Sequence, residues 1–463
     1  MSTPMSAREW GVLFVLCGAI FLEGIDVAML NVALPSIRAD LGLSTAMLSG
    51  VVSAYVLGYG GFMLLGGRAA DLFGRRRMLL FWLTVFLVFS GLGGLATDGW
   101  TLLVARFVTG VAAAFMTPAG LSIITTSFAE GPRRNKALLV YAATGAAGFS
   151  LGLVAGGLLT AIGWRWVFFA PVILSALILA AALPLIPRAR ASARGRTDVA
   201  GALTITVAML LLVYAVVRLE RPAEGWGWTA AAFAVGLAAL AAFVAIERRS
   251  PAPLLRLGIL ANRPLVRANA AALLFAGSFF AFQFLITLYL QELRGWSSLE
   301  TGLALLVVAI DAILAPTLTP RLVARFGNAR VIAGGLAFAT LAYVLFLPVT
   351  DDWTYAAMFP TMITLGLAFA LTYGPLTIAA TDGVAEHEQG VAGGLLNTNF
   401  QFGAALGISL ATAVHVATLT TASPLTAIRT ALLVPAIAAA SALVIALTGL
   451  RKPEVAPEPQ LVA

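Results

Sequence analysis

Long apolar runs recur along almost the whole chain, and they constrain its fold more than any other feature. Hydrophobic residues make up 60% and charged residues 11% of the 463 positions, whereas soluble domains carry about 25% charged residues. Runs of about 20 residues fit helices that cross a bilayer and exclude the shorter alternating strands of a membrane barrel. Because lipid leaves backbone groups no other partners, we expect an all-α integral membrane protein.

Fourteen such runs are bounded by charged residues, glycine or proline. The first is too long for a signal peptide and lacks a cleavage motif, so we expect it to be retained as a helix. An even number of crossings places both chain ends on the same side of the membrane. The runs cover residues 11–37, 46–66, 78–97, 101–121, 137–160, 166–187, 199–217, 229–246, 268–290, 298–319, 331–348, 354–376, 391–418 and 430–450.

Lysine and arginine are distributed unevenly over the two sides of this arrangement. The side that holds the termini carries most of them, and basic segments stay in the cytoplasm. Both termini are therefore expected in the cytoplasm, and the richness in Ala, Gly and Arg favours a bacterial inner membrane. The same bias explains the net charge of +8 without any nucleic-acid partner. The opposite side carries Arg38, Arg165, Arg218, Arg221, Arg294 and Arg429.

One short segment, from Gly67 to Arg77, places an acid and four arginines between two apolar runs. Such charge density is costly in a bilayer, so we expect an aqueous loop. Its pattern, Gly-x-x-x-Asp-x-x-Gly-Arg-Arg, resembles the signature loop between helices 2 and 3 of major facilitator superfamily transporters. We expect the glycine at its start to allow close helix contact, and the acid to pair with Arg75 or Arg76 and latch the cytoplasmic side shut. A plain cytoplasmic anchor, which would need only the arginines, is the alternative. The expected latch residues are Gly67, Arg68, Asp71, Gly74, Arg75 and Arg76.

A second, weaker copy of this segment lies 253 residues further on, at residues 320–330. It repeats one arginine, the Phe-Gly pair and the last arginine, but has Ala324 where the first copy has Asp71. The duplication predicts a six-helix half at 1–187 and another at 268–450. Residues 188–267 would then hold two inserted helices and a charged connector, and 451–463 a cytoplasmic tail.

Two acidic residues, Glu23 and Asp26, lie within the first apolar run. Asp26 is about ten residues, or roughly 15 Å, from the outer end of that run and so near the bilayer centre. Glu23 lies three residues earlier on about the same helix face. Neighbouring acids in apolar surroundings favour binding of a proton, as a proton carrier requires. Permanent protonation, or bonding to neighbouring helices, remains the alternative for both.

Two further ionisable residues lie within apolar runs. Arg106 is a fixed cation that could lie near Asp26 and promote release of its proton, or it could extend to the membrane surface. Asp311 has no polar neighbours in sequence that would explain it. It could face a central cavity and bind a cation or proton, or it could make a structural cross-helix hydrogen bond.

The fifth run carries a line of small residues suited to close helix packing. Its members are Gly148, Gly152, Gly156 and Gly157. They resemble the antiporter motif Gly-x-x-x-Gly-Pro-x-x-Gly-Gly of the same superfamily, although Leu153 replaces the proline. That replacement leaves room for symport as well as antiport. Gly403 and Gly407 repeat the spacing near the C-terminus.

Nearly end to end, the chain resembles the fourteen-helix drug:proton antiporters of that superfamily. Residues 25–37 resemble the family's first-helix motif, an acid followed by Asn-x-Ala-Leu-Pro. Arg106 with Gly110 matches its helix-4 motif Arg-x-x-x-Gly, whose arginine is implicated in proton transfer. The resemblance supports Asp26 and Arg106, and with the buried acids Glu23 and Asp311 these are the expected proton-coupling residues.

A substrate cavity is expected to be large and apolar with few polar anchors, which suits hydrophobic or cationic drug-like molecules. Each candidate could instead be plain packing. The candidates are Asn31, Tyr55, Tyr59, Phe115, Met116, Phe279, Phe280, Gln283, Phe284, Tyr373, Asn397, Asn399 and Gln401.

The sequence thus predicts a proton-driven exporter rather than an enzyme. We expect no cofactor, no metal site and no nucleotide-binding loop, and a monomer whose partners are lipid, protons and substrate. A transporter of one metabolite or self-made antibiotic is the alternative. A membrane sensor that does not transport is less expected, because it would need neither buried acids nor a latch.

Overall fold

A computed structural model describes residues 5–128, 132–187, 199–218, 226–250, 257–382, Val384 and 389–450. Within these ranges all regular structure is helical, as expected. The side chains of a few residues inside them, including Arg68 and Asp71, lie outside the described part, as does the predicted tail 451–463.

The helices before the predicted insertion follow the apolar runs with small shifts at their ends. Ser6 caps the first helix in a reciprocal capping box with Glu9, which satisfies backbone N–H groups at its start. These helices are α1 (Ala7–Leu41), α2 (Thr45–Phe73), α3 (Arg75–Gly94), α4 (Gly99–Ser127), α5 (Pro132–Ile162) and α6 (Trp166–Leu185); α7 (Val199–Arg218) and α8 (Trp226–Glu247) follow.

The later helices are more broken than predicted. The run 298–319 and the run 430–450 were each expected to be one helix, and each is divided. The first run is interrupted by a 3-10 segment at Leu306–Ile310 and again at Leu318, and α12 then begins at Thr319 with Pro320 in its first turn. Pro435 likewise lies in the first turn of α17. The first turn of a helix is a position that proline tolerates. The elements are η2 (Leu257–Ala261), α9 (Arg263–Leu288), η3 (Tyr289–Leu293), α10 (Ser298–Leu305), η4 (Leu306–Ile310), α11 (Asp311–Thr317), α12 (Thr319–Phe326), α13 (Asn328–Phe346), α14 (Tyr355–Thr381), α15 (Gln389–Leu419), α16 (Pro424–Ala431) and α17 (Leu433–Leu450).

Eleven helical segments in the described part are long and apolar enough to cross a membrane. Shorter apolar helical stretches lie at Gly50–Met63, Ala147–Ile162 and Leu203–Leu212, within α2, α5 and α7. The chain is therefore a multi-pass membrane protein, while the number of fourteen crossings stays a prediction.

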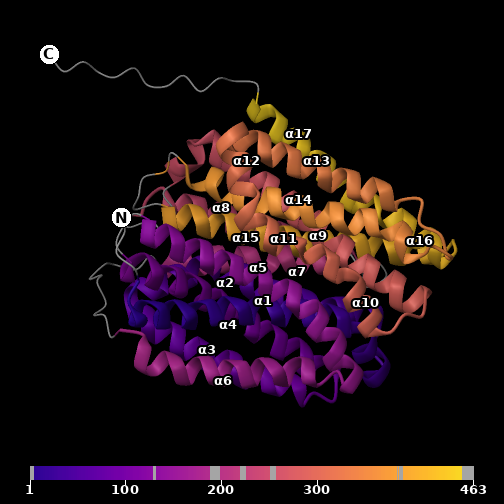
Figure 1. Cartoon of the computed structure of the whole chain (residues 1–463), viewed down its shortest axis with the longest axis horizontal. Coiled ribbons are helices and arrows are strands. Elements are labelled where there is room, and N and C mark those ends of the chain that lie inside the picture. Colours follow the sequence, from indigo (N-terminus) through magenta and orange to yellow (C-terminus); the bar gives the residue numbers. More distant parts are fainter. Residues whose placement is uncertain are drawn as a thin grey trace.

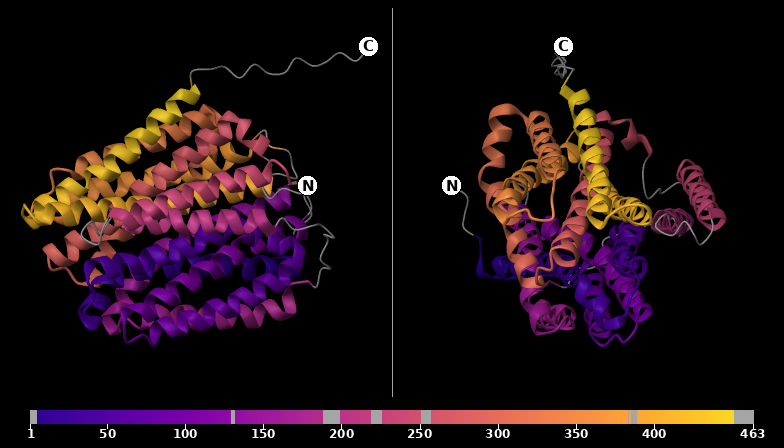
Figure 2. Two further views of the ribbon diagram at one scale, coloured as in Figure 1. Left: turned by 180° about the vertical axis from the view of Figure 1, so that it is seen from behind. Right: turned by 90° about the vertical axis from the view of Figure 1, so that its right-hand side faces the viewer.

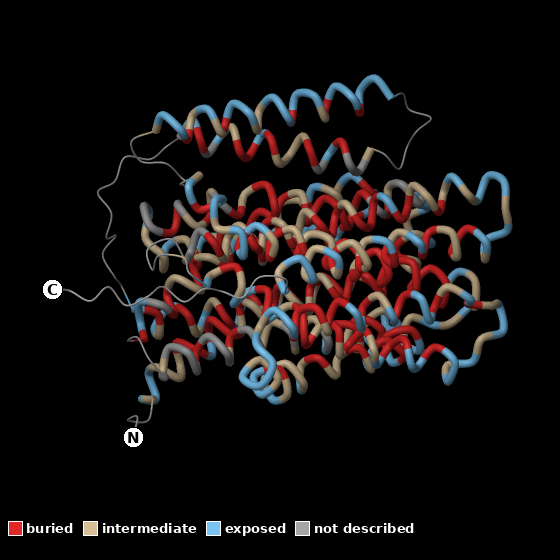
Figure 3. Tube along the Cα trace, turned by 90° about the horizontal axis from the view of Figure 1, so that it is seen from above, coloured by how far each residue is buried: buried red, intermediate tan, exposed pale blue. Residues whose placement is uncertain are grey.

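Helices close in sequence lie together in space. Figure 1 shows α1 to α6 on one side of the bundle and α9 to α17 on the other. The pair α7 and α8 lies beside the main body (Figure 2, right), and the outer of the two is exposed over much of its length (Figure 3). Helix α7 contacts both α2 and α15, so the pair lies along the boundary between the two groups.

The weak sequence repeat is reproduced in the backbone. Gly74 separates α2 from α3 with φ +95°, and Gly327 separates α12 from α13 with φ +82°. The next residue then donates to a carbonyl of the neighbouring helix: Arg75 Nη1 to Ser122 O at 3.3 Å, and Asn328 Nδ2 to Pro375 O at 2.9 Å. Both the donors and the acceptors are separated by the 253 residues of the sequence repeat.

The segment Gly67–Arg77 is not the loop that was expected. Helix α2 continues to Phe73 and α3 begins at Arg75, so only Gly74 lies outside a helix. A one-residue junction is possible because glycine adopts positive φ without a Cβ clash.

Gly74→Ala should lower the melting temperature, because a side chain at positive φ costs roughly 1–2 kcal/mol. Gly334→Ala is the matched control: no atom lies within 4 Å of its added Cβ, and it is a helix-interior residue of α13. Thermal unfolding in detergent should show a lower melting temperature for Gly74→Ala and an unchanged one for Gly334→Ala. Equal melting temperatures for the two would contradict this account of the junction.

Candidate functional site

Close packing of α1 against α5 fixes the position of the two acids in the first helix. A Cβ on Gly148 would lie 2.6 Å from the Phe21 carbonyl oxygen, and one on Gly152 would lie 2.9 Å from the Ile25 Cα. A Cβ on Gly156 would likewise collide with the backbone of Met29. Three of the four predicted seam glycines therefore pack against the face of α1 that flanks Glu23 and Asp26, and Gly157 packs against α10 instead.

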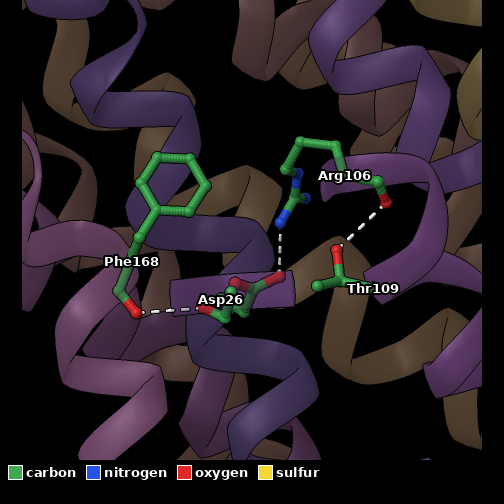
Figure 4. Close-up of polar contacts among 5 residues, drawn as sticks. Asp26, Arg106, Thr109 and Phe168 are labelled. Carbon is green, nitrogen blue, oxygen red and sulfur yellow. Dashed lines mark hydrogen bonds and ion pairs between the residues drawn. The ribbon is translucent and has the colours of Figure 1, made fainter. Parts of the chain in front are cut away.

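Asp26 forms an ion pair with Arg106, which lies on α4. The Arg106 Nη1 atom lies 2.5 Å from Asp26 Oδ2, and each side chain is 3% exposed (Figure 4). Extension of Arg106 to the membrane surface, the alternative left open by the sequence, is therefore wrong. A charge pair this deeply buried is stable only if its geometry is good, because removing each ion from water costs free energy.

Aromatic rings extend the Asp26–Arg106 pair towards α2. The guanidinium carbon of Arg106 lies 4.4 Å from the centre of the Tyr55 ring, a cation–π contact. Tyr55 stacks on Tyr59 one helical turn further, with ring centres 6.0 Å apart. The ion pair thus has an aromatic wall that holds the arginine in place.

Glu23 has a different type of partner. Thr117 on α4 donates its hydroxyl to Glu23 Oε2 at 2.7 Å, and the Tyr59 hydroxyl lies 2.9 Å from the same Thr117 oxygen. The other carboxylate oxygen, Oε1, is buried without a hydrogen-bond partner in the described part of the chain. Sequence reasoning missed Thr117. It follows Arg106 by eleven residues, about three helical turns, so its position on the same helix face was the available signal.

A small pocket, rather than the large cavity that was expected, lies beside the ion pair and joins the two groups of helices. Its walls come from α1, α2, α4, α9 and α15, which brings together residues from both predicted halves. Five predicted site residues line it: Asn31, Tyr55, Arg106, Phe280 and Gln401; apolar side chains complete the wall, namely Val27, Leu30, Val52, Val56, Ala404 and Ile408.

An aromatic cluster continues from this pocket into the later helices. Phe280 packs edge-on against Phe400, and Tyr373 lies 5.1 Å from Phe400 between ring centres. The Tyr373 hydroxyl donates to Asn397 Oδ1 at 3.5 Å. Asn399 instead donates to Asn269 at 2.9 Å, a link between α15 and α9.

The remaining cavity candidates lie in packed surroundings. Met116 belongs to the apolar core among α1 to α6, and Phe115 stacks on Trp82 with ring centres 4.3 Å apart. Gln283 is 2% exposed, and both of its side-chain polar atoms are buried without partners in the described residues.

Asp311 is distant in sequence from Asp26 and Arg106 and lies on a different helix. It is buried, 6% exposed, and is the first residue of α11, directly after the 3-10 segment η4. Helix α11 packs against α14 and α5. Both roles considered for Asp311, binding a cation or proton in a cavity and bonding to a neighbouring helix, stay predictions.

The predicted latch residues contact neighbouring helix ends. Arg76 Nη2 donates to the Leu183 carbonyl of α6 at 2.6 Å, and Arg75 donates to Ser122 of α4. Close helix contact was predicted at Gly67, but it occurs at Gly66, where an added Cβ would collide with Ala114 of α4. An added Cβ on Gly67 would meet its nearest neighbour at only 3.9 Å. The latch pairing of Asp71, and the position of the Arg68 side chain, lie outside the described part.

At the far end of the bundle from Gly74, the two groups of helices are joined directly. Arg38 Nη1 lies 2.8 Å from Glu292 Oε1, and Gln291 Nε2 donates to the Val32 carbonyl at 3.1 Å. A Cβ on Gly157 would lie 2.8 Å from a backbone oxygen of α10. These contacts hold α1 and α5 against the segment that follows α9, so the two groups of helices are closed against each other at this end.

Comparison with known proteins identifies the family to which this architecture corresponds. A family model described as Major Facilitator Superfamily matches residues 16–408. The puromycin resistance protein of Streptomyces alboniger is 38% identical over 416 residues, 87% of this chain and 81% of that protein. The cephamycin export protein of Amycolatopsis lactamdurans is 36% identical over 420 residues, 88% of this chain and 85% of that protein.

Solved structures agree on the fold at low sequence identity. A peptide transporter of the POT family aligns with a TM-score of 0.69 and 17% identity, over 96% of this chain and 98% of that one. An inward-facing bacterial homologue of the lysosomal transporter Spinster aligns with a TM-score of 0.66 and 19% identity, over 98% of this chain and 100% of that one.

Proposed function

Because the chain belongs to the major facilitator superfamily of transporters, we propose that it exports hydrophobic or cationic drug-like compounds in exchange for protons. The observation that carries the proposal is the position of the Asp26–Arg106 pair beside the pocket that joins both groups of helices. Glu23 lies one helical turn before Asp26 on α1, so a buried acid next to this pair can bind a proton when the pocket empties and lose it when a substrate enters.

The proposed transport cycle rocks two halves around this pocket. We place the halves at residues 1–187 and 268–450, with fourteen crossings, both termini in the cytoplasm and the chain acting as a monomer in a bacterial inner membrane. Asp71 and its neighbouring arginines would close the cytoplasmic side while the cavity faces outward. The energy source is the proton gradient, and no cofactor is needed.

Purified protein in liposomes tests the exchange. An acidic lumen should drive a lipophilic cationic dye inward, and a gradient of one pH unit supports about tenfold accumulation for one-to-one exchange. Nigericin, which collapses the gradient, should release the dye, and protein-free liposomes supply the baseline. Dye movement that ignores the pH gradient would contradict proton exchange.

A transporter of one antibiotic is the second candidate, favoured by relatives named for single compounds such as puromycin and cephamycin. The same liposomes distinguish the two. Competition by many unrelated hydrophobic cations indicates a broad exporter, whereas saturable uptake of one compound with no competition from dyes indicates a specific one.

A further inference from the structure

The Thr117 hydroxyl lies within hydrogen-bond distance of three other oxygens. Its Oγ1 atom is 2.7 Å from Glu23 Oε2, 2.9 Å from the Tyr59 hydroxyl and 3.0 Å from the Ala113 carbonyl. Thr117 is 8% exposed and Glu23 is 6% exposed. A hydroxyl donates one proton and accepts through its lone pairs, so it cannot donate to all three oxygens at once.

This arrangement can serve Glu23 in both protonation states. When Glu23 is ionised, Thr117 donates to the carboxylate and Tyr59 donates to Thr117. When Glu23 carries a proton, its own O–H donates to Thr117, and the Thr117 proton turns to the Ala113 carbonyl, which can only accept. Gain or loss of the proton therefore reorients one buried hydroxyl and leaves the Glu23–Thr117 hydrogen bond intact.

Asp26 has the opposite type of partner. The guanidinium of Arg106 only donates, and it stays protonated under all ordinary conditions. Its hydrogen bond at 2.5 Å is therefore strongest with the ionised carboxylate. Protonation of Asp26 would leave the buried cation uncompensated, which is strongly unfavourable.

We propose that Thr117 is the positioning residue for proton exchange at Glu23, and that Glu23 binds and releases the transported proton while Asp26 stays ionised against Arg106. The Glu23 carboxylate takes one proton from the outer side after substrate leaves and releases it to the cytoplasmic side when the next substrate binds. Only the carboxyl O–H bond forms and breaks. The inference rests on the proton exchange proposed above and assigns its two acids different tasks.

Several other titratable groups lie near enough to Glu23 to influence it. Tyrosines are neutral between about pH 5 and 9, so a pH profile in that range reports the carboxyl groups. In the described part of the chain these neighbours are Asp26 of α1, Tyr55 and Tyr59 of α2, Arg106 of α4, Tyr141 of α5 and Tyr373 of α14.

Thr117→Val tests the proposal, because valine keeps the shape and removes the hydroxyl. The variant loses the Thr117 hydrogen bond to Glu23 in both protonation states, and the bond to the ionised carboxylate is the stronger of these two. The ionised form is therefore destabilised more, and Glu23 should keep its proton to higher pH. We expect the midpoint of the pH profile of dye transport to rise by about one unit. Thr117→Ser should restore the wild-type midpoint.

Thr109→Val is the matched control. Thr109 is also buried on α4, but its hydroxyl donates to the Arg106 carbonyl within the same helix (Figure 4). This variant should keep the wild-type midpoint. If Thr117→Val is not recovered as folded protein, Tyr59→Phe removes the donor to Thr117 and should shift the midpoint in the same direction by a smaller amount.

A second measurement follows protons directly, as acid released when dye is added to detergent-solubilised protein in weak buffer. Glu23→Gln should abolish this release. Persistence of the release in Glu23→Gln, or an unchanged midpoint in both Thr117→Val and Tyr59→Phe, would overturn the inference while wild-type proton exchange stands. If wild-type protein itself releases no proton and ignores the gradient, the proposed function fails as well.

Discussion

Asp26→Asn is expected to abolish gradient-driven dye transport and to destabilise the protein by about 3–5 kcal/mol, the usual cost of removing one partner of a buried ion pair. The substitution keeps the size of the side chain but leaves Arg106 as a buried cation without its counter-charge. Both side chains are only 3% exposed, so water cannot compensate the lost charge. Dye uptake in liposomes and thermal unfolding in detergent measure the two effects.

A second substitution at Arg106 separates charge balance from transport. The double variant Asp26→Asn/Arg106→Gln should be more stable than Asp26→Asn alone, because no charge is left uncompensated. It should still fail to transport, since the pair that organises the pocket is gone. If the double variant is no more stable than the single one, the ion pair does not explain the loss.

An exposed ion pair of the same helix supplies the control. Asp40 of α1 bonds to Arg165 at 2.9 Å, but these side chains are 47% and 41% exposed. Such pairs contribute roughly 0–1 kcal/mol. Asp40→Asn should therefore transport and unfold almost as wild type does.

The sequence predicted the helical membrane fold and the repeat well, because both follow from features that act locally. Apolar runs of bilayer length require helices, and glycine is favoured wherever a one-residue junction needs positive φ, as at Gly74 and Gly327. The breaks at Leu306–Ile310 and near Pro435 were missed because the apolar pattern runs through them without a change.

The site could be predicted only where a charged residue in an apolar run requires a partner of opposite charge. An isolated arginine in an apolar run requires an acid, so the association of Arg106 with Asp26 could be anticipated. Thr117 was missed although it lies on the same helix face as Arg106, because threonine in a membrane helix ordinarily satisfies itself on a carbonyl of its own helix. Thr117 does lie within reach of the Ala113 carbonyl, and only the three-dimensional packing places Glu23 beside it.

Joining Arg38 to Glu292 by a covalent cross-link is expected to stop transport almost completely. These residues lie on opposite sides of the boundary between the two groups of helices and approach to 2.8 Å. If the two halves must separate at this end to release substrate, a fixed link holds the pocket closed. Their side chains are 36% and 37% exposed, so loss of the ion pair alone should have little effect.

The test uses Arg38→Cys/Glu292→Cys in a Cys17→Ala background, which removes the single native cysteine. A bifunctional thiol reagent with a cleavable disulfide spacer should abolish dye transport, and a reducing agent should restore it. Asp40→Cys/Arg165→Cys is the matched control, since that pair lies at the same end but within the first predicted half. Cross-linking the control should leave transport intact because the two residues move together. If both links stop transport alike, general rigidity at this end is responsible; if neither does, separation of Arg38 from Glu292 is not part of the cycle.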